Sequence, residues 1–192
     1  IRHYRFLSGV LARTVMPEPV QIPWRDDAPP VPPGKPYVVL NFGSNEYGRR
    51  WPFDKYVATA HKLLAAGHRV VFCGATFDND HKALVKNEFS SPDVVDLIGE
   101  TTVPELMDLI NHAAGMLTND TGPAHLGIAL GTPTLVLVGG GHFGSFVPSP
   151  DEVRPENAMF LHVEMDCYHC FWGCHLRASD RDSFPCVAAI EE

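Results

Sequence analysis

The chain has 192 residues, of which 45% are hydrophobic and 20% charged, and its formal net charge is −8 at pH 7. This composition suits one domain with a full core and excludes wholesale disorder. The acidic balance disfavours a nucleic-acid-binding surface, which needs a basic face, and no apolar run is long enough to predict a transmembrane helix. The amino-terminal residues contain three arginines and no signal-peptide core, so we expect a cytoplasmic protein.

The amino-terminal part differs in composition from the rest. Residues 1–16 are compatible with one short helix, and residues 17–36 contain eight prolines. Because proline fixes φ and lacks an N–H, we expect an extended, semi-rigid segment there. The predicted organisation is a linker at 1–36, a globular domain at 37–165 and a cysteine-rich tail at 166–192.

From Tyr37 onward, apolar runs alternate with helical patterns. The runs have strand length and predict five buried parallel strands, at 37–42, 69–73, 94–98, 114–117 and 134–138. Four helices are predicted between them: one ended by Gly67, one capped by Asp78, one opened by a Thr102–Glu105 capping box, and one from Pro123 to Gly131. This order predicts an α/β fold, a Rossmann-like parallel sheet with helices on both faces.

Such sheets bind ligands outside the carboxyl ends of their strands. The fourth strand runs into a polar turn, residues 118–122, and a helix follows. Asp120 or Thr121 can cap that helix with a side-chain oxygen, and the free N–H groups and dipole of its first turn favour a phosphate. An ordinary capped helix start explains this stretch equally well. The fifth strand ends at Gly139–Gly141, which we expect to be a flexible loop.

Charged residues follow two other predicted strands. Arg49 and Arg50 come after the first strand, where two guanidiniums can clamp a diphosphate, although adjacent arginines are more often only solvated. Asp78 comes after the second strand, where a carboxylate can accept both hydroxyls of a ribose. The alternative role of Asp78 is that of a helix cap.

Four of the five cysteines lie in the tail, as Cys167, Cys170, Cys174 and Cys186. Their spacing and the interleaved histidines are compatible with tetrahedral zinc, and disulfides or free thiols are the alternatives. Cys73 lies alone in an apolar strand and should behave as a small hydrophobe.

Several motifs occur together in this chain: Gly43-Ser44, Arg49-Arg50-Trp51-Pro52, Gly99-Glu100-Thr101-Thr102, Asn119-Asp120-Thr121-Gly122-Pro123-Ala124-His125 and Ala129-Leu130-Gly131-Thr132-Pro133. In this order and spacing they resemble the carboxy-terminal half of glycosyltransferase family 9, the ADP-heptose:lipopolysaccharide heptosyltransferases and their relatives. The resemblance extends over roughly residues 37–148. Its most specific part is the Asp-Thr-Gly-Pro-x-His segment with the later Gly-Thr-Pro.

The resemblance implies a GT-B architecture, in which two Rossmann-like domains face one another across a cleft and the nucleotide-sugar donor lies mainly on the carboxy-terminal one. The backbone of Asp120, Thr121 and Gly122 would hold the donor diphosphate. Asp120 would also face the sugar hydroxyls, and His125 would orient the turn.

Three further residues acquire roles from the same resemblance. Arg49 stands where the family usually has lysine and would neutralise charge on the departing nucleoside diphosphate. Ser44 would lie beside the phosphates, and Asp78 matches the acidic ribose partner. The exchange of lysine for arginine keeps the charge but alters its geometry, which leaves the donor preference open.

The reaction implied is inverting and independent of metals and cofactors, with an ADP-heptose-like donor and a glycolipid or saccharide acceptor. The general base and the acceptor site of the family belong to the amino-terminal domain, so no catalytic residue is expected in this chain. We expect a donor-binding half, inactive alone, which in the complete enzyme associates peripherally with a membrane. Since the family chemistry requires no metal, thiols or disulfides are favoured over zinc in the tail.

Other classes of protein are compatible with parts of the sequence. A GT-B sugar-nucleotide epimerase has a similar donor half, but the Asp-Thr-Gly-Pro-x-His context argues against it. A stand-alone nucleotide-sugar-binding module would need no second domain. A zinc-stapled interaction domain would depend on the tail alone.

Overall fold

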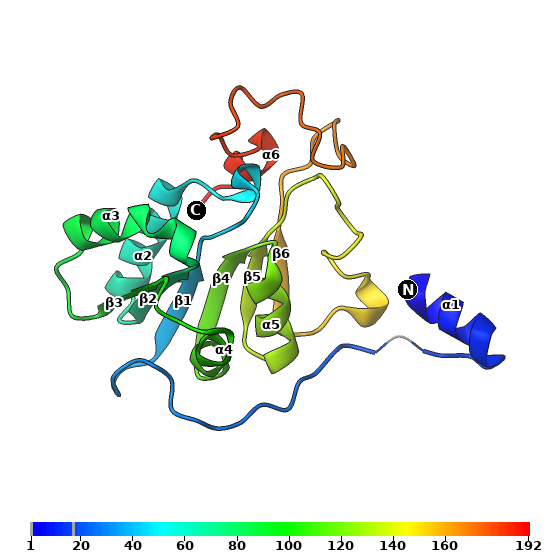
Figure 1. The fold of residues 1–192 in the computed structure, drawn as a ribbon, viewed down its shortest axis with the longest axis horizontal. Coiled ribbons are helices and arrows are strands. Elements are labelled where there is room, and N and C mark those ends of the chain that lie inside the picture. Colours follow the sequence, from blue (N-terminus) through cyan, green and yellow to red (C-terminus); the bar gives the residue numbers. More distant parts are fainter. Residues whose placement is uncertain (1, 17) are drawn as a thin grey trace.

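The computed structural model describes residues 2–16 and 18–192. Its centre is a six-stranded, entirely parallel sheet with the strand order β3-β2-β1-β4-β5-β6 (Figure 1). The strands are β1 Tyr37–Asn41, β2 Arg69–Gly74, β3 Val94–Ile98, β4 Gly115–Asn119, β5 Thr134–Leu137 and β6 Ala158–Leu161. The predicted α/β fold is therefore confirmed. The chain reverses its direction of travel across the sheet between β1 and β4, and ligands of such sheets bind at this switch point.

The helices lie on both faces of the sheet, as predicted. Those on the faces are α2 Phe53–Ala65, α3 Asp80–Glu88, α4 Val103–Asn111 and α5 Gly122–Leu130. Helices α1 Arg2–Leu11 and α6 Pro185–Ala188 belong to the terminal segments, and short 3-10 turns lie at Tyr47–Arg49, Thr76–Asp78 and Asp151–Val153. The Thr102–Glu105 capping box that opens α4 is present. Gly67 and Gly131 have φ values of +88° and +82°, which explains why glycine stands where α2 and α5 end.

Strand side chains alternate between two cores. Leu40, Phe42 and Phe72 pack with Tyr56 of α2 on one face, together with Val85 of α3. The other face carries Val39, Val71 and Cys73, which pack against Leu109 and Ile110 of α4. This two-sided burial explains the continuous apolar runs of the strands. Cys73 is fully buried, as expected of a small hydrophobe.

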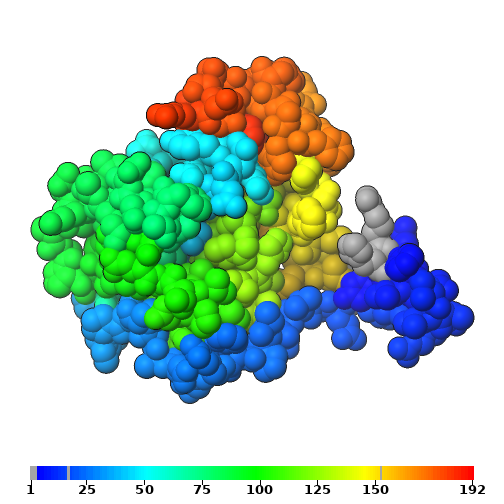
Figure 2. Space-filling view, viewed as in Figure 1, coloured from blue at the N-terminus to red at the C-terminus, as the bar shows by residue number. Residues whose placement is uncertain are grey.

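The proline-rich segment is extended, as predicted, and contacts the domain along the lower edge in Figure 1. Trp24 Nε1 donates to Asp108 Oδ1 over 2.7 Å, and Arg25 Nη2 lies 2.6 Å from Asp108 Oδ2. The Arg25 hydrogen bond lowers the pKa of the Asp108 carboxyl. Helix α1, by contrast, projects away from the sheet (Figures 1 and 2).

Two expectations about the region after β5 were wrong. The sixth strand was not predicted, because Ala158–Leu161 is only four residues long and follows a proline-rich loop. Gly139–Gly141 is not an open flexible loop: all three glycines are buried beneath the tail. A Cβ atom at Gly140 would lie 2.2 Å from the Tyr168 ring. The tail can therefore pack against this loop only because its glycines have no side chains.

The tail, residues 166–192, covers the edge of the sheet where the strands end. Phe184, Cys186, Val187 and Ile190 are part of the core on the α2 face. Figure 2 shows the orange tail directly against the cyan segment that follows β1, and Phe184 N donates to Gly48 O there. The boundaries at 36 and 165 stay a prediction, since both flanking segments pack on the domain. No helix in the described residues is long and apolar enough to cross a membrane.

Candidate functional site

A cavity of about 410 Å³ opens at the carboxyl ends of the strands. Loops after four strands line it, with Gly43 and Ser44 after β1, Ala75 after β2, Thr101 after β3, and Thr121 and Gly122 after β4. Its volume lies within the range of small-molecule sites. The cavity is therefore at the place where a doubly wound sheet binds ligands.

Asn119, the last residue of β4, forms hydrogen bonds to the segments that follow β1, close to the cavity. Its Oδ1 accepts hydrogen bonds from Trp51 N at 3.0 Å and Tyr56 Oη at 3.2 Å, and its Nδ2 donates to Phe42 O at 2.6 Å. This fully buried side chain fixes the end of β1 and the segment after Arg50 to the end of β4. Sequence reasoning assigned Asn119 no role beyond its motif, and the only signal was a polar residue at the end of an apolar strand.

The start of α5 differs from the prediction in its capping. Thr121 is the N-cap residue, but its side chain makes no capping bond, and its hydroxyl instead donates to Asn119 O at 3.3 Å. No other described side chain caps this helix. A Cβ at Gly122 would meet nothing within 4 Å, so the cavity reaches the backbone there. The first turn of α5 thus presents its positive end to the cavity without a capping oxygen.

Buried polar atoms without a hydrogen-bond partner cluster at this cavity. Within the described residues there are three such side-chain atoms: Ser44 Oγ, Arg49 Nε and Asp78 Oδ1. All three residues line the cavity. The other visible interactions of Arg49 are a long 3.4 Å bond from Nη1 to Asp120 O and a guanidinium carbon 5.2 Å from the Trp172 ring centroid. Since buried polar groups are nearly always satisfied, Ser44 Oγ and Arg49 Nε point to a ligand that supplies acceptors. Asp78 Oδ1 is itself an acceptor and has an ion-pair partner in Arg50.

Asp78 does not cap α3, contrary to the sequence-based expectation. It belongs to the 3-10 turn Thr76–Asp78, and Asn79 precedes α3 without a side-chain bond. The Asp78 Oδ2 atom accepts from Ala75 N at 2.9 Å, and Oδ1 lies 3.1 Å from Arg50 Nη1. Burial raises the pKa of this carboxyl, and the Ala75 N–H and the Arg50 charge oppose that rise. Arg50 is thus paired with Asp78, and Arg49 is the arginine directed at the cavity.

Asp120 lies beside the cavity among three cationic or titratable groups. Burial raises the pKa of its carboxyl, and the charges of His125, Arg49 and His142 act in the opposite direction. His125 itself is exposed. The structure therefore brings Arg49, Asp120 and His125 together, while Ser44, Asp78, Thr121 and Gly122 line the cavity. His142 and Trp172 were missed by sequence reasoning, because only the packing of the tail brings them here.

An Asp120→Asn variant should be more thermally stable than the wild-type chain near pH 7. The folded-state pKa lies above the unfolded value, so ionisation of the buried carboxyl opposes folding at pH values above the folded pKa. At pH values below the unfolded pKa, the Asp120 carboxyl is neutral in both the folded and the unfolded state, so the stability advantage of the variant disappears. Melting temperatures measured near pH 7 and near pH 3 test this; an equal difference at both pH values would contradict it.

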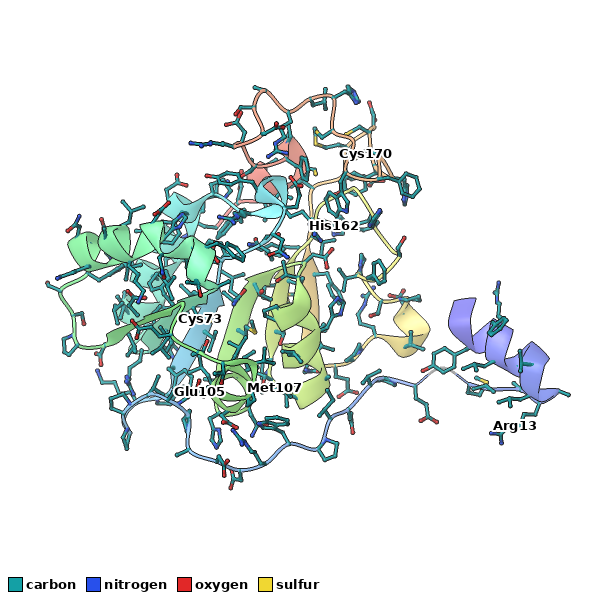
Figure 3. All side chains as sticks on the ribbon, in the orientation of Figure 1. Arg13, Cys73, Glu105, Met107, His162 and Cys170 are labelled. Atoms are coloured by element: carbon teal, nitrogen blue, oxygen red, sulfur yellow. The ribbon has the colours of Figure 1, made fainter. Side chains whose placement is uncertain are left out.

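The tail cysteines are all thiols in the structure. Cys167, Cys170, Cys174 and Cys186 line a small cavity between the tail and Gly140, far from Cys73 in the sheet (Figure 3). Among residues 2–16 and 18–192, no three potential ligands are placed to hold a metal ion. Gly140 N donates to Cys186 Sγ, and burial raises the pKa of that thiol.

The amino-acid sequence was compared with models of known protein families and with known proteins. The family model described as glycosyltransferase family 9 (heptosyltransferase) matches residues 19–171. The chain belongs to glycosyltransferase family 9. Lipopolysaccharide heptosyltransferase 3 of Escherichia coli is 36% identical over 110 residues, which cover 55% of this chain and 32% of the relative. Lipooligosaccharide heptosyltransferase 2 of Haemophilus influenzae is 30% identical over 99 residues, 49% of this chain and 29% of the relative.

The family-9 chain thus matches only about a third of the length of these curated relatives. Among solved structures, E. coli ADP-heptose lps heptosyltransferase II has a TM-score of 0.60 at 24% identity, covering 68% of this chain and 39% of the other. E. coli heptosyltransferase WaaC, solved with ADP-2-deoxy-2-fluoro heptose, has a TM-score of 0.55 at 18% identity, covering 74% of this chain and 43% of the other. These structures share the fold of the family-9 chain, and family membership argues against the epimerase alternative.

Proposed function

We propose that this chain is the nucleotide-sugar-binding part of a glycosyltransferase that transfers heptose, or a related sugar, from an ADP-sugar to a lipopolysaccharide-core-type acceptor. The observation that carries the proposal is the pair of unpartnered buried groups, Ser44 Oγ and Arg49 Nε, beside the uncapped first turn of α5. A diphosphate supplies acceptor oxygens for all of them and compensates the positive dipole. Family membership and relatives described as heptosyltransferases support the sugar class.

The lining of the cavity suggests how the donor lies. The nucleoside would occupy the side formed by Ala75, Asp78 and Thr101, with its ribose toward the Asp78 turn. Because Asp78 is paired with Arg50, ribose recognition through its carboxylate requires a shared or rearranged hydrogen bond. This role of Asp78 therefore stays a prediction.

The diphosphate would lie between Arg49 and the backbone of Thr121 and Gly122. The sugar would then extend toward Asp120 and His125, on the side away from the nucleoside. Hydroxyls of the donor sugar would donate hydrogen bonds to the Asp120 carboxylate, whose ionised form is favoured by the nearby Arg49 guanidinium. His125, one turn into α5, would orient this part of the site.

The contribution of this part to catalysis would be stabilisation of the leaving group. As an acceptor hydroxyl displaces the diphosphate in line, negative charge grows on the departing phosphate oxygens. The Arg49 guanidinium and the first-turn N–H groups are fixed before that charge develops, which is the arrangement that stabilises a transition state. The general base and the acceptor would come from a preceding domain, in a cytoplasmic enzyme peripherally associated with a membrane.

Two assays test the proposal. The chain should bind ADP in a calorimeter in the presence of a chelator, and it should transfer heptose from ADP-heptose only when an amino-terminal heptosyltransferase half is supplied. Absence of ADP binding would contradict the donor site. ADP binding without transfer in the reconstituted enzyme would instead indicate a nucleotide-sugar-binding module.

A further inference from the structure

Trp172 of the tail contacts two groups of the donor site at once. The guanidinium carbon of Arg49 lies 5.2 Å from its ring centroid. Its Nε1 donates to His142 Nδ1 over 3.2 Å. Arg49 and His142 come from the loops after β1 and β5, and both act on the Asp120 carboxyl. One tail residue thus links two loops that flank the turn after β4.

The position of Trp172 is fixed from several sides. Its ring stacks on Phe184 at 5.4 Å and an interplanar angle of 18°, and Phe184 is part of the buried core. A Cβ atom at Gly141 would lie 2.3 Å from the indole, so only glycine allows this approach. Phe171 N donates to Gly141 O at 3.1 Å, which ties the tail backbone to the same loop.

The backbone of the tail is strained at this point. Trp172 has a φ of +66°, and Phe171 and His169 also have positive φ values. Non-glycine residues in this region cost free energy, and such strain persists where the surrounding contacts over-determine it. The strained segment places the indole between Arg49 and the core, while the neighbouring Phe171 is 75% exposed.

The indole of Trp172 interacts differently with His142 and with Arg49. An indole N–H only donates, so His142 Nδ1 accepts and the proton of the neutral ring is on Nε2. The ring face attracts the guanidinium without using any of its five N–H groups. The stacked Arg49 therefore keeps its donors for a ligand, which a carboxylate partner would not allow.

We propose that Trp172 is a positioning residue of the donor site, which holds the Arg49 guanidinium toward the diphosphate and fixes the tautomer and orientation of His142. The cysteine-rich tail is in this sense a part of the donor site. The inference rests on the proposed function, because it assigns Arg49 to the diphosphate of that same site.

The test compares ADP with AMP, because only ADP carries the second phosphate. Trp172→Leu should weaken ADP binding roughly 10-fold and change AMP binding less than about 2-fold, both measured by calorimetry. In an Arg49→Met background, the same substitution should cause less than about a 2-fold further loss, since the two residues act as one unit. Equal losses for ADP and AMP, or additive losses in the double variant, would overturn the inference.

Trp24→Leu is the matched control. Trp24 also has an arginine over its ring, Arg25 at 5.4 Å, and also donates from Nε1, but it lies on the linker side of the domain. This variant should leave both affinities unchanged. If Trp172→Leu does not fold, Trp172→Phe decides: its weaker ring should reduce ADP affinity roughly 3-fold without affecting AMP, and an unchanged ADP affinity contradicts the inference. A wild-type chain that binds neither nucleotide would refute the proposed function itself.

Discussion

Replacing Arg49 with Met is expected to weaken ADP binding roughly 10- to 100-fold, the loss expected when charge-assisted hydrogen bonds to a phosphate are removed. The guanidinium has one buried N–H without a partner, and within the described residues it forms no ion pair with a carboxylate, so its donors are available to a ligand. Methionine is unbranched and apolar, so it replaces the stem of the arginine side chain while removing the charge and every N–H donor. Calorimetric titration of ADP into both proteins measures the difference.

Two further variants sharpen this experiment. Arg49→Lys keeps the charge and should recover most of the affinity, although the geometry of a single ammonium differs from that of a guanidinium. Arg25→Met removes a guanidinium that also packs on a tryptophan but pairs with Asp108 on the linker side, and it should leave ADP affinity unchanged. An Arg49→Met protein with wild-type affinity would remove Arg49 from the site.

An Asn119→Leu variant should lose about 4 kcal/mol of unfolding free energy, because three buried groups lose a hydrogen bond at a cost of about 1–3 kcal/mol each, and of these only Tyr56 Oη keeps another partner, Asn41 O. The three groups are Trp51 N, Tyr56 Oη and Phe42 O, all in the core around the end of β4. Urea denaturation followed by circular dichroism measures the change.

Thr118→Val serves as the control for that variant. Thr118 is the preceding residue of β4 and is also fully buried, but its hydroxyl makes long bonds to Asn41 Oδ1 at 3.5 Å and Asn119 O at 3.1 Å. Thr118→Val should therefore lower the free energy of unfolding by less than about 1.5 kcal/mol. If both variants lost equal stability, Asn119 would not be the residue that joins β1 to β4.

The sequence was sufficient to predict the elements whose signals are local. The apolar runs at β1, β2 and β5 and the Thr102–Glu105 capping box specify their own structures, because burial on both faces and helix capping depend on neighbouring residues. The convergence of Ser44 and Thr121 at one cavity also followed, since parallel strands place their ends at one edge.

Long-range packing decided the features that sequence reasoning missed. Nothing near Trp172 in the chain indicates that its ring contacts Arg49, more than a hundred residues earlier. The pairing of Asp78 with Arg50 similarly depends on a close approach of two loops, in which a Cβ at Gly43 would lie 2.3 Å from Asp78 Oδ2. Glycines that admit a partner from elsewhere are indistinguishable in sequence from glycines of a flexible loop.

A crystal structure of the chain with bound ADP would examine the central claim most directly. We predict density for the diphosphate against the backbone of Thr121 and Gly122, within hydrogen-bond distance of the Arg49 guanidinium, and density for the nucleoside toward Ala75 and Thr101. A diphosphate bound anywhere else on the chain, with the first turn of α5 left empty, would contradict the account.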